Sequence, residues 1–271
     1  MTVDLDAYFA RIGYHGGRAP TLHALNAICE AHVIAIPFEN LDVLLGRPIS
    51  LSDAAVDDKL LHRGRGGYCF EHNTLLHRVL RALGFEATLL SARARVSRAR
   101  DETPPRTHVF VRVETEGESW LADVGVGGLS STAAVRLVPD LEQPTPHEPR
   151  RLVREGGRWF HQARLGDAWV DVIEFTLEEM PAIDREVGHW FTSAHPASPF
   201  RQGPMVARAL PEGGRVTLRG DQLTLRTGGR VDRRTLDTPG LLLDALERWF
   251  GLRFPEGTTF GAAWSEHAPA P

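Results

Sequence analysis

Apolar side chains recur at helical spacing through the first 85 residues of the chain. The clearest helix is predicted directly after Cys69, where one apolar stripe is formed by Leu75, Leu76, Val79, Leu80 and Leu83. Gly84 is a suitable residue to end this helix. Shorter helices are predicted over residues 4–12, after the N-cap Thr21, and after Ser52 or Asp53. The first part of the chain is therefore predicted to be helical.

The pattern changes to alternation of apolar and polar residues from Glu86 to about Glu174. Strands are predicted over residues 87–90, 109–113, 119–122, 158–160 and 168–172, with glycine turns between them and a proline-rich loop over 139–149. After Phe200 the pattern predicts strands over 215–219 and 222–226 and a helix over 241–250. These segregated elements indicate an α+β fold, divided into residues 1–85, 86–200 and 201–271.

Composition narrows the class of protein. The chain has 271 residues, a 42% hydrophobic content and a net charge of −4, without a basic patch that would indicate nucleic-acid binding. The N-terminus has no signal-peptide pattern, and no apolar run approaches the roughly 20 residues of a membrane helix. Two cysteines are too few for a disulfide framework. We therefore expect a cytoplasmic protein with free thiols, in which Cys29 is a buried apolar residue.

The candidate chemistry centres on the run from Arg65 to Asn73. Cys69 follows a glycine-rich turn and begins the predicted helix. Backbone N–H groups and the helix dipole favour a thiolate at such a position, and the thiolate is the reactive form of cysteine. Cys69 is therefore a candidate nucleophile that needs a base and a group to orient that base.

A predicted β-hairpin supplies both groups. If Thr115 pairs with Glu118, His108 and Asp123 are diagonal neighbours on one face of the hairpin, with Cβ atoms roughly 5–8 Å apart. This spacing suits an imidazole–carboxylate hydrogen bond, and Gly125 opposite His108 leaves room for the ring. The argument requires a hairpin loop without a bulge.

A metal site is the weaker interpretation of the same region. His62, Cys69, His72 and His77 all lie nearby, but His72 and His77 are five residues apart on the predicted helix and point to different faces. We therefore expect no metal site.

Three short motifs together resemble those of the arylamine N-acetyltransferases. They are residues 65–69, which end in Cys69, the pair Thr107 and His108, and residues 123–127, which begin with Asp123. Residues 37–41 and 191–200 match further motifs of that family. The resemblance extends over about residues 30–200. It implies a helical bundle, a central β-barrel and a C-terminal α/β lid, with a core like that of cysteine proteases.

The resemblance also implies a ping-pong reaction. Cys69 would accept an acetyl group from acetyl-CoA, the co-substrate, and an arylamine, arylhydrazine or arylhydroxylamine would then collect it. Arg65 and Glu39 resemble a structural ion pair. Positions that resemble coenzyme A contacts are Thr107, Gly125, Gly127, Ser193 and Phe200. Positions that resemble the acceptor pocket are Phe38, Tyr68 and Val126. The expected partners are these small molecules, and the expected state is a monomer or weak homodimer.

Val126 departs from the family pattern, which usually has an aromatic residue there. Valine would widen the acceptor pocket and remove a ring contact worth roughly 0.5–1.5 kcal/mol. Three other functions stay open. An amide synthase of the same fold would take a polyketide from a carrier protein. A cysteine hydrolase would release the acyl group to water. A binding module would be catalytically silent, although the intact Cys69, His108 and Asp123 set argues against it.

Overall fold

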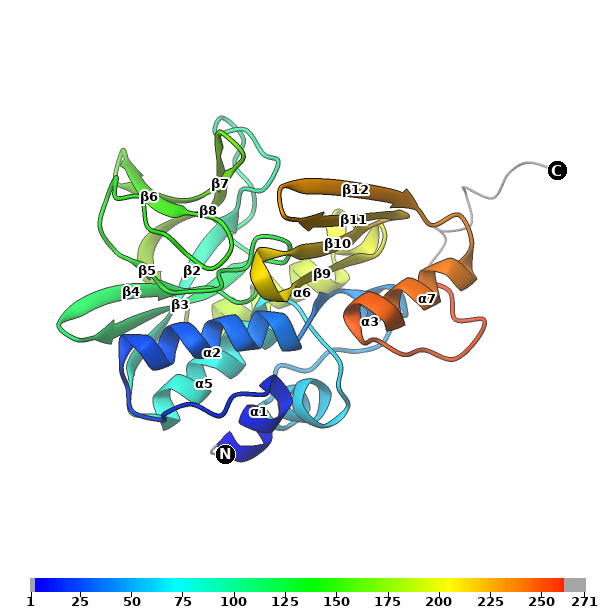
Figure 1. Cartoon of the computed structure of the whole chain (residues 1–271), viewed down its shortest axis with the longest axis horizontal. Coiled ribbons are helices and arrows are strands. Elements are labelled where there is room, and N and C mark those ends of the chain that lie inside the picture. Colours follow the sequence, from blue (N-terminus) through cyan, green and yellow to red (C-terminus); the bar gives the residue numbers. More distant parts are fainter. Residues whose placement is uncertain (1–2, 261–271) are drawn as a thin grey trace.

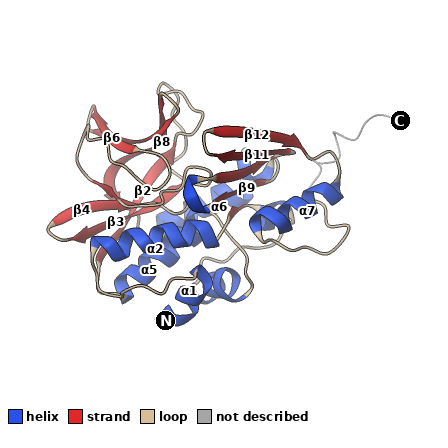
Figure 2. Cartoon of the chain, in the orientation of Figure 1, coloured by secondary structure: helices blue, strands red, loops and turns tan. Residues whose placement is uncertain are grey.

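Two β-sheets and the helices packed against them form the protein, for which a computed structural model describes residues 3–260 (Figure 1; Figure 2). The α-helices are α1 Leu5–Ile12, α2 Leu22–Ala35, α3 Leu41–Leu44, α4 Asp53–Asp57, α5 Cys69–Ala82, α6 Ala182–Ala194 and α7 Pro239–Phe250. The strands are β1 Phe38–Glu39, β2 Glu86–Ala94, β3 His108–Thr115, β4 Glu118–Ala122, β5 Val135–Arg136, β6 Arg150–Glu155, β7 Arg158–Leu165, β8 Ala168–Glu179, β9 Met205–Ala209, β10 Arg215–Arg219, β11 Gln222–Thr227 and β12 Arg230–Thr235. A π-helix over Asp58–His62 and short 3₁₀ turns over Pro199–Arg201 and Pro211–Gly213 complete the described elements.

The larger sheet is a nearly closed barrel of seven strands in the order β5-β4-β3-β2-β8-β7-β6. Gln143 links its two edges. The backbone of Gln143 exchanges two hydrogen bonds with Arg150 of β6, at 2.7 and 2.8 Å. Its side chain exchanges two more with the backbone of Arg136 of β5, at 2.7 and 3.0 Å. The Gln143 side chain thus replaces the backbone hydrogen bonds that would otherwise join the two edge strands, β5 and β6.

The helical part packs beneath β3 and β4 (Figure 1). The predicted apolar stripe of α5 is buried there, with Leu75, Leu76, Val79 and Leu80 fully inaccessible. The caps predicted at Thr21 and Ser52 are present, because each side chain accepts a hydrogen bond from the third residue after it. Cys29 is fully buried, as expected. The helix after Ser52 continues as the π-helix rather than as a regular α-helix.

The second sheet, in the order β1-β9-β10-β11-β12, joins distant parts of the chain. β1 comes from the N-terminal part and pairs with β9, so that Phe38 lies opposite Ala207. Helix α7 covers one face of this sheet through Leu242, Leu246 and Phe250. The fold class predicted from the sequence, α+β with a bundle, a barrel and further α/β elements, is confirmed.

Seven of the described α-helices and strands escaped the sequence analysis, namely α3, α6, β1, β5, β6, β9 and β12. The residues of β12 are all exposed and mostly charged, so they show no apolar alternation. Helix α6 has no side-chain cap at Pro181, so it lacks the usual sequence signal for a helix start. Ile183, Val187 and Trp190 have helical spacing on one face, but that face is exposed rather than packed on the core. Within residues 3–260, no helix has the combined length and hydropathy needed to cross a membrane.

Candidate active site

Cys69 is the first residue of α5, and neighbouring charges hold the helix start in place. The Glu71 carboxylate accepts a hydrogen bond from the Tyr68 backbone N–H at 3.0 Å. Its other oxygen accepts one from Lys59 at 2.7 Å. The backbone N–H groups at the start of a helix have no partner within the helix, so that of Cys69 is available to a ligand. The sequence analysis did not assign Lys59 or Glu71 a role.

The glycines before Cys69 are required by close packing. A Cβ atom on Gly66 would lie 1.9 Å from the Pro37 carbonyl oxygen, and one on Gly67 would lie 2.4 Å from a Glu71 carboxylate oxygen. The same loop is held by Arg65, whose guanidinium contacts Glu39 at 2.6 Å, as expected from the resemblance. This packing fixes the backbone that leads into Cys69.

His108 and Asp123 meet as the hairpin argument predicts. Thr115 pairs with Glu118 and the register continues to Val111 opposite Ala122, without a bulge. His108 Nε2 lies 2.7 Å from Asp123 Oδ2, and both side chains are buried. Because Nε2 faces the carboxylate, Nδ1 remains for the cysteine.

Charge coupling links the three residues. Burial lowers the pKa of His108, but the Asp123 carboxylate, its hydrogen bond and the adjacent Cys69 outweigh burial and raise that pKa to about 10. Burial raises the pKa of Asp123, but the His108 charge and several hydrogen bonds bring it below its ordinary value. As a thiol, Cys69 Sγ donates to the Thr107 carbonyl at 3.6 Å. The arrangement therefore favours an imidazolium at His108, next to Cys69.

Asn73 ties the three elements of the site together. It lies one helical turn after Cys69 and is fully buried. Its side-chain amide donates to the Val109 carbonyl at 2.7 Å and to Asp123 Oδ1 at 2.9 Å. Its oxygen accepts from the Val124 backbone N–H at 3.0 Å. The sequence analysis gave Asn73 no role, and its i+4 spacing from Cys69 is the only signal that pointed to it.

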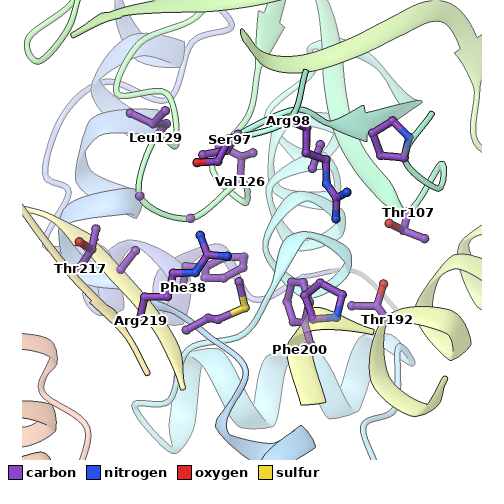
Figure 3. A pocket seen from close by; sticks show the side chains of 18 of the residues that line it. Phe38, Ser97, Arg98, Thr107, Val126, Leu129, Thr192, Phe200, Thr217 and Arg219 are labelled. Atoms are coloured by element: carbon purple, nitrogen blue, oxygen red, sulfur yellow. The ribbon is translucent and has the colours of Figure 1, made fainter. Parts of the chain in front are cut away.

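A cavity of about 650 Å³ opens between the barrel and the second sheet. Figure 3 shows Phe38, Val126 and Phe200 along its walls, with Thr107 at one side. Cys69 itself is not among the lining residues, but Thr107 both lines this cavity and accepts the hydrogen bond of the Cys69 thiol, so the thiol lies next to this wall.

The predicted binding residues divide into two groups. Those that line the cavity are Phe38, Thr107, Val126, Gly127 and Phe200. Gly125, Tyr68 and Ser193 are not among its lining residues and instead support the site from behind.

Each supporting residue has a clear structural contact. A Cβ atom on Gly125 would lie 2.8 Å from Cys69 Cα, so this glycine makes room for the helix start rather than for the His108 ring. The Tyr68 hydroxyl lies 2.6 Å from His189 Nδ1, and its ring packs on Phe200 at 5.5 Å. The Ser193 hydroxyl donates to the His189 carbonyl at 2.8 Å.

The histidines near Cys69 are otherwise engaged. His72 Nδ1 lies 2.8 Å from His32 Nε2, and His72 Nε2 donates to the Pro37 carbonyl at 3.2 Å. Among residues 3–260, no three histidine, cysteine or acidic side chains are placed to hold a metal ion together.

A cysteine at a helix start beside a histidine–aspartate pair on a barrel defines a core like that of the cysteine proteases. A family model described as N-acetyltransferase matches residues 21–258. The arylamine N-acetyltransferase of Escherichia coli (strain K12) is 42% identical over 253 residues, which cover 93% of this chain and 90% of that protein. The chain therefore belongs to the arylamine N-acetyltransferase family.

Solved structures agree with this assignment. The M. smegmatis arylamine N-acetyltransferase superimposes with a TM-score of 0.91 at 40% identity, covering 99% of this chain and 100% of that one. The Mycobacterium marinum arylamine N-acetyltransferase in complex with CoA gives a TM-score of 0.90 at 37% identity, with 98% of each chain covered.

Proposed function

We propose that the protein transfers an acetyl group from acetyl-CoA to the nitrogen of an arylamine, arylhydrazine or arylhydroxylamine through an acetyl-cysteine intermediate on Cys69. The observation that carries the proposal is the coupled Cys69, His108 and Asp123 set beside the cavity. Two relatives support the coenzyme A donor and the arylamine acceptor. One is the M. marinum enzyme solved with CoA, and the other is a 40% identical Salmonella typhimurium protein named arylamine N-acetyltransferase / N-hydroxyarylamine O-acetyltransferase.

In the first half-reaction the Cys69 thiolate attacks the thioester carbonyl carbon. The backbone N–H of Cys69 stabilises the resulting oxyanion. When the intermediate collapses, the carbon–sulfur bond to coenzyme A breaks, and the leaving thiolate takes the proton from the His108 imidazolium. The products of this step are free coenzyme A, acetyl-Cys69 and a neutral His108.

In the second half-reaction the amine nitrogen attacks the acetyl-Cys69 carbonyl. An aromatic amine is neutral at pH 7 and therefore already nucleophilic. The nitrogen loses a proton to His108 and the Cys69 thiolate leaves, which restores the thiolate–imidazolium pair. Asp123 keeps the imidazole oriented through both steps by its contact with Nε2.

The test is the intact mass of the protein after mixing with acetyl-CoA alone. We expect one acetyl adduct on Cys69, which is stable until an arylamine or hydrazine is added and is absent in Cys69→Ala. Cys29→Ala is the matched control, because burial raises the pKa of Cys29 to about 12 and keeps it unreactive. Continuous release of coenzyme A without an acceptor would instead indicate a hydrolase. Absence of any adduct would indicate another acyl donor.

The base is tested by alkylation of Cys69 with iodoacetamide across pH. Asp123→Asn removes the charge that raises the pKa of His108, so the buried imidazole becomes neutral near pH 7 and no longer stabilises the thiolate. We expect the alkylation rate at pH 7 to fall by at least about 10-fold, since a change of one pKa unit alters the populations tenfold. An unchanged pH profile would contradict the roles given to His108 and Asp123.

A further inference from the structure

Two buried arginines share a single carboxylate where the barrel meets the second sheet. Arg150 of β6 is fully inaccessible, and Arg215 of β10 is 3% exposed. The Glu148 carboxylate accepts hydrogen bonds from Arg215 at 2.6 and 2.7 Å and from Arg150 at 3.2 Å. Among residues 3–260, neither arginine makes an ion pair with any other carboxylate. One positive charge is therefore left over in a buried region.

The unmatched charge belongs to Arg150. Its Nη2 donates to Glu148 and, at 2.9 Å, to the Leu129 carbonyl, but its Nε and Nη1 are buried without a hydrogen-bond partner among the described residues. Burial, followed by the charge of Arg215, lowers the pKa of Arg150 to about 10, so the guanidinium keeps its charge at pH 7. A buried charge with unpaired donors is costly unless a partner of opposite charge is present.

His161 of β7 lies beside Arg150 on the inner face of the barrel. Arg150 is opposite Ala163 and Leu152 is opposite His161, so the arginine and the histidine are diagonal neighbours on one face, roughly 7–8 Å apart. This face points inward, because Leu152 and Ala163 belong to the apolar core of the barrel. His161 Nε2 is also buried without a partner in the described part of the chain.

The state of the His161 ring suits an acceptor rather than another donor. Burial, followed by the charge of Arg150, lowers the pKa of His161 to about 3, so the ring is neutral at pH 7. A neutral imidazole with its hydrogen on Nε2 donates one hydrogen bond from that atom. Arg150 and His161 thus supply unpaired donors from two neighbouring strands, and the matching acceptor is missing.

We propose that Arg150 and His161 bind a small monovalent anion such as chloride inside the barrel. The anion accepts hydrogen bonds from Nε and Nη1 of Arg150 and from Nε2 of His161, and its single charge balances the charge left over beside Glu148. Water would accept the same bonds but leave that charge uncompensated. The apolar Leu152 and Ala163 share this interior, which favours a single-atom ion over a larger one.

This site is distinct from the cavity beside Cys69. Neither Arg150 nor His161 is among the residues that line that cavity. The inference therefore goes beyond the proposed acyl transfer and does not depend on it.

Thermal unfolding of the unaltered protein gives the first test. Sodium chloride or sodium bromide replaces sodium gluconate at constant ionic strength, so that screening of surface charges is the same throughout. We expect a saturable rise in melting temperature of about 3–6 °C when the anion reaches ten times its dissociation constant. Equal melting temperatures in chloride and gluconate would overturn the proposal.

Variants assign the effect to the site. Arg150→Met removes the donors and the excess charge, while Glu148 keeps Arg215 as its partner. Arg151→Met is the matched control, because Arg151 is on the opposite face of β6 and contacts the Gln162 side chain at 2.7 Å. We expect the difference between chloride and gluconate to vanish in Arg150→Met and to persist in Arg151→Met. The same anion response in both variants would refute the site.

The position of the anion is measured directly with bromide. Crystals of the unaltered protein are soaked in sodium bromide, and anomalous scattering locates the ion. We expect a peak in contact with the Arg150 guanidinium and His161 Nε2. This measurement needs no substitution, so it decides the question even if Arg150→Met does not fold. Bromide at the protein surface alone, or only water beside Arg150, would overturn the proposal.

Discussion

Replacing Asn73 by leucine tests the claim that one buried amide holds the candidate active site together. Leucine has a similar size but no polar atoms. The substitution removes the partners of the Val109 carbonyl and the Val124 N–H, and one of the partners of Asp123 Oδ1. Asp123 keeps its contacts with His108 and with the Gly125 N–H, so its charge is not left without partners.

The cost follows from the two backbone groups that lose their partners. Each buried polar group left without a hydrogen bond costs about 1–3 kcal/mol, so we expect a loss of stability of about 3 kcal/mol. In a domain of this size, one kcal/mol corresponds to about 2–4 °C in melting temperature, which predicts a fall of about 6–12 °C. The Asp123 carboxylate also becomes freer to turn, so the imidazolium is held less firmly beside Cys69.

The assays are thermal unfolding and the pH profile of Cys69 alkylation. Asn26→Leu is the matched control, because the Asn26 side chain accepts one hydrogen bond, from the Ala134 N–H at 2.9 Å, away from the site. We expect that control to lose less stability and to keep its alkylation profile. If Asn73→Leu is as stable as Asn26→Leu and alkylates normally, Asn73 does not position the site.

Two other predictions concern the acceptor and the pH dependence of stability. Val126→Phe adds a ring to the cavity wall. It should raise kcat/KM for small arylamines by up to about 10-fold and lower kcat/KM for bulky ones. Unchanged rates across an arylamine series would refute the role of this wall. Burial, followed by the charge of Arg150, lowers the pKa of His161 from 6.5 to about 3, so the folded protein keeps this imidazole neutral while the unfolded chain binds a proton below pH 6.5. The contribution of the neutral His161 to the free energy of unfolding is therefore complete above pH 6.5. It is lost as the pH falls toward 3, by roughly 1.4 kcal/mol per pH unit. In a plot of unfolding free energy against pH, His161→Leu should flatten the slope on the acid side. The exposed control His23→Leu should leave that slope unchanged. Equal slopes in both variants would contradict the role given to His161.

Much of the site was predictable because it depends on short-range rules. The start of α5 at Cys69 follows from helix periodicity, and the contact between His108 and Asp123 follows from the two-residue period of one hairpin. Each rule involves residues close together in the chain. Gly125 illustrates the limit, because the hairpin assigned it the space of the His108 ring whereas the structure uses that space for Cys69 Cα.

The sequence by itself determined that a helical part is followed by a strand-rich part, that the candidate nucleophile begins a helix, and that a histidine–aspartate pair forms on one hairpin. These features depend on local periodicity and on neighbours within one hairpin. The tertiary structure alone decided that Asn73 joins α5 to β3, that β1 pairs with β9, and that Arg219 and Arg226 line the cavity. Such contacts join residues far apart in the chain, and chain folding selects them through burial and hydrogen bonding that no local pattern records.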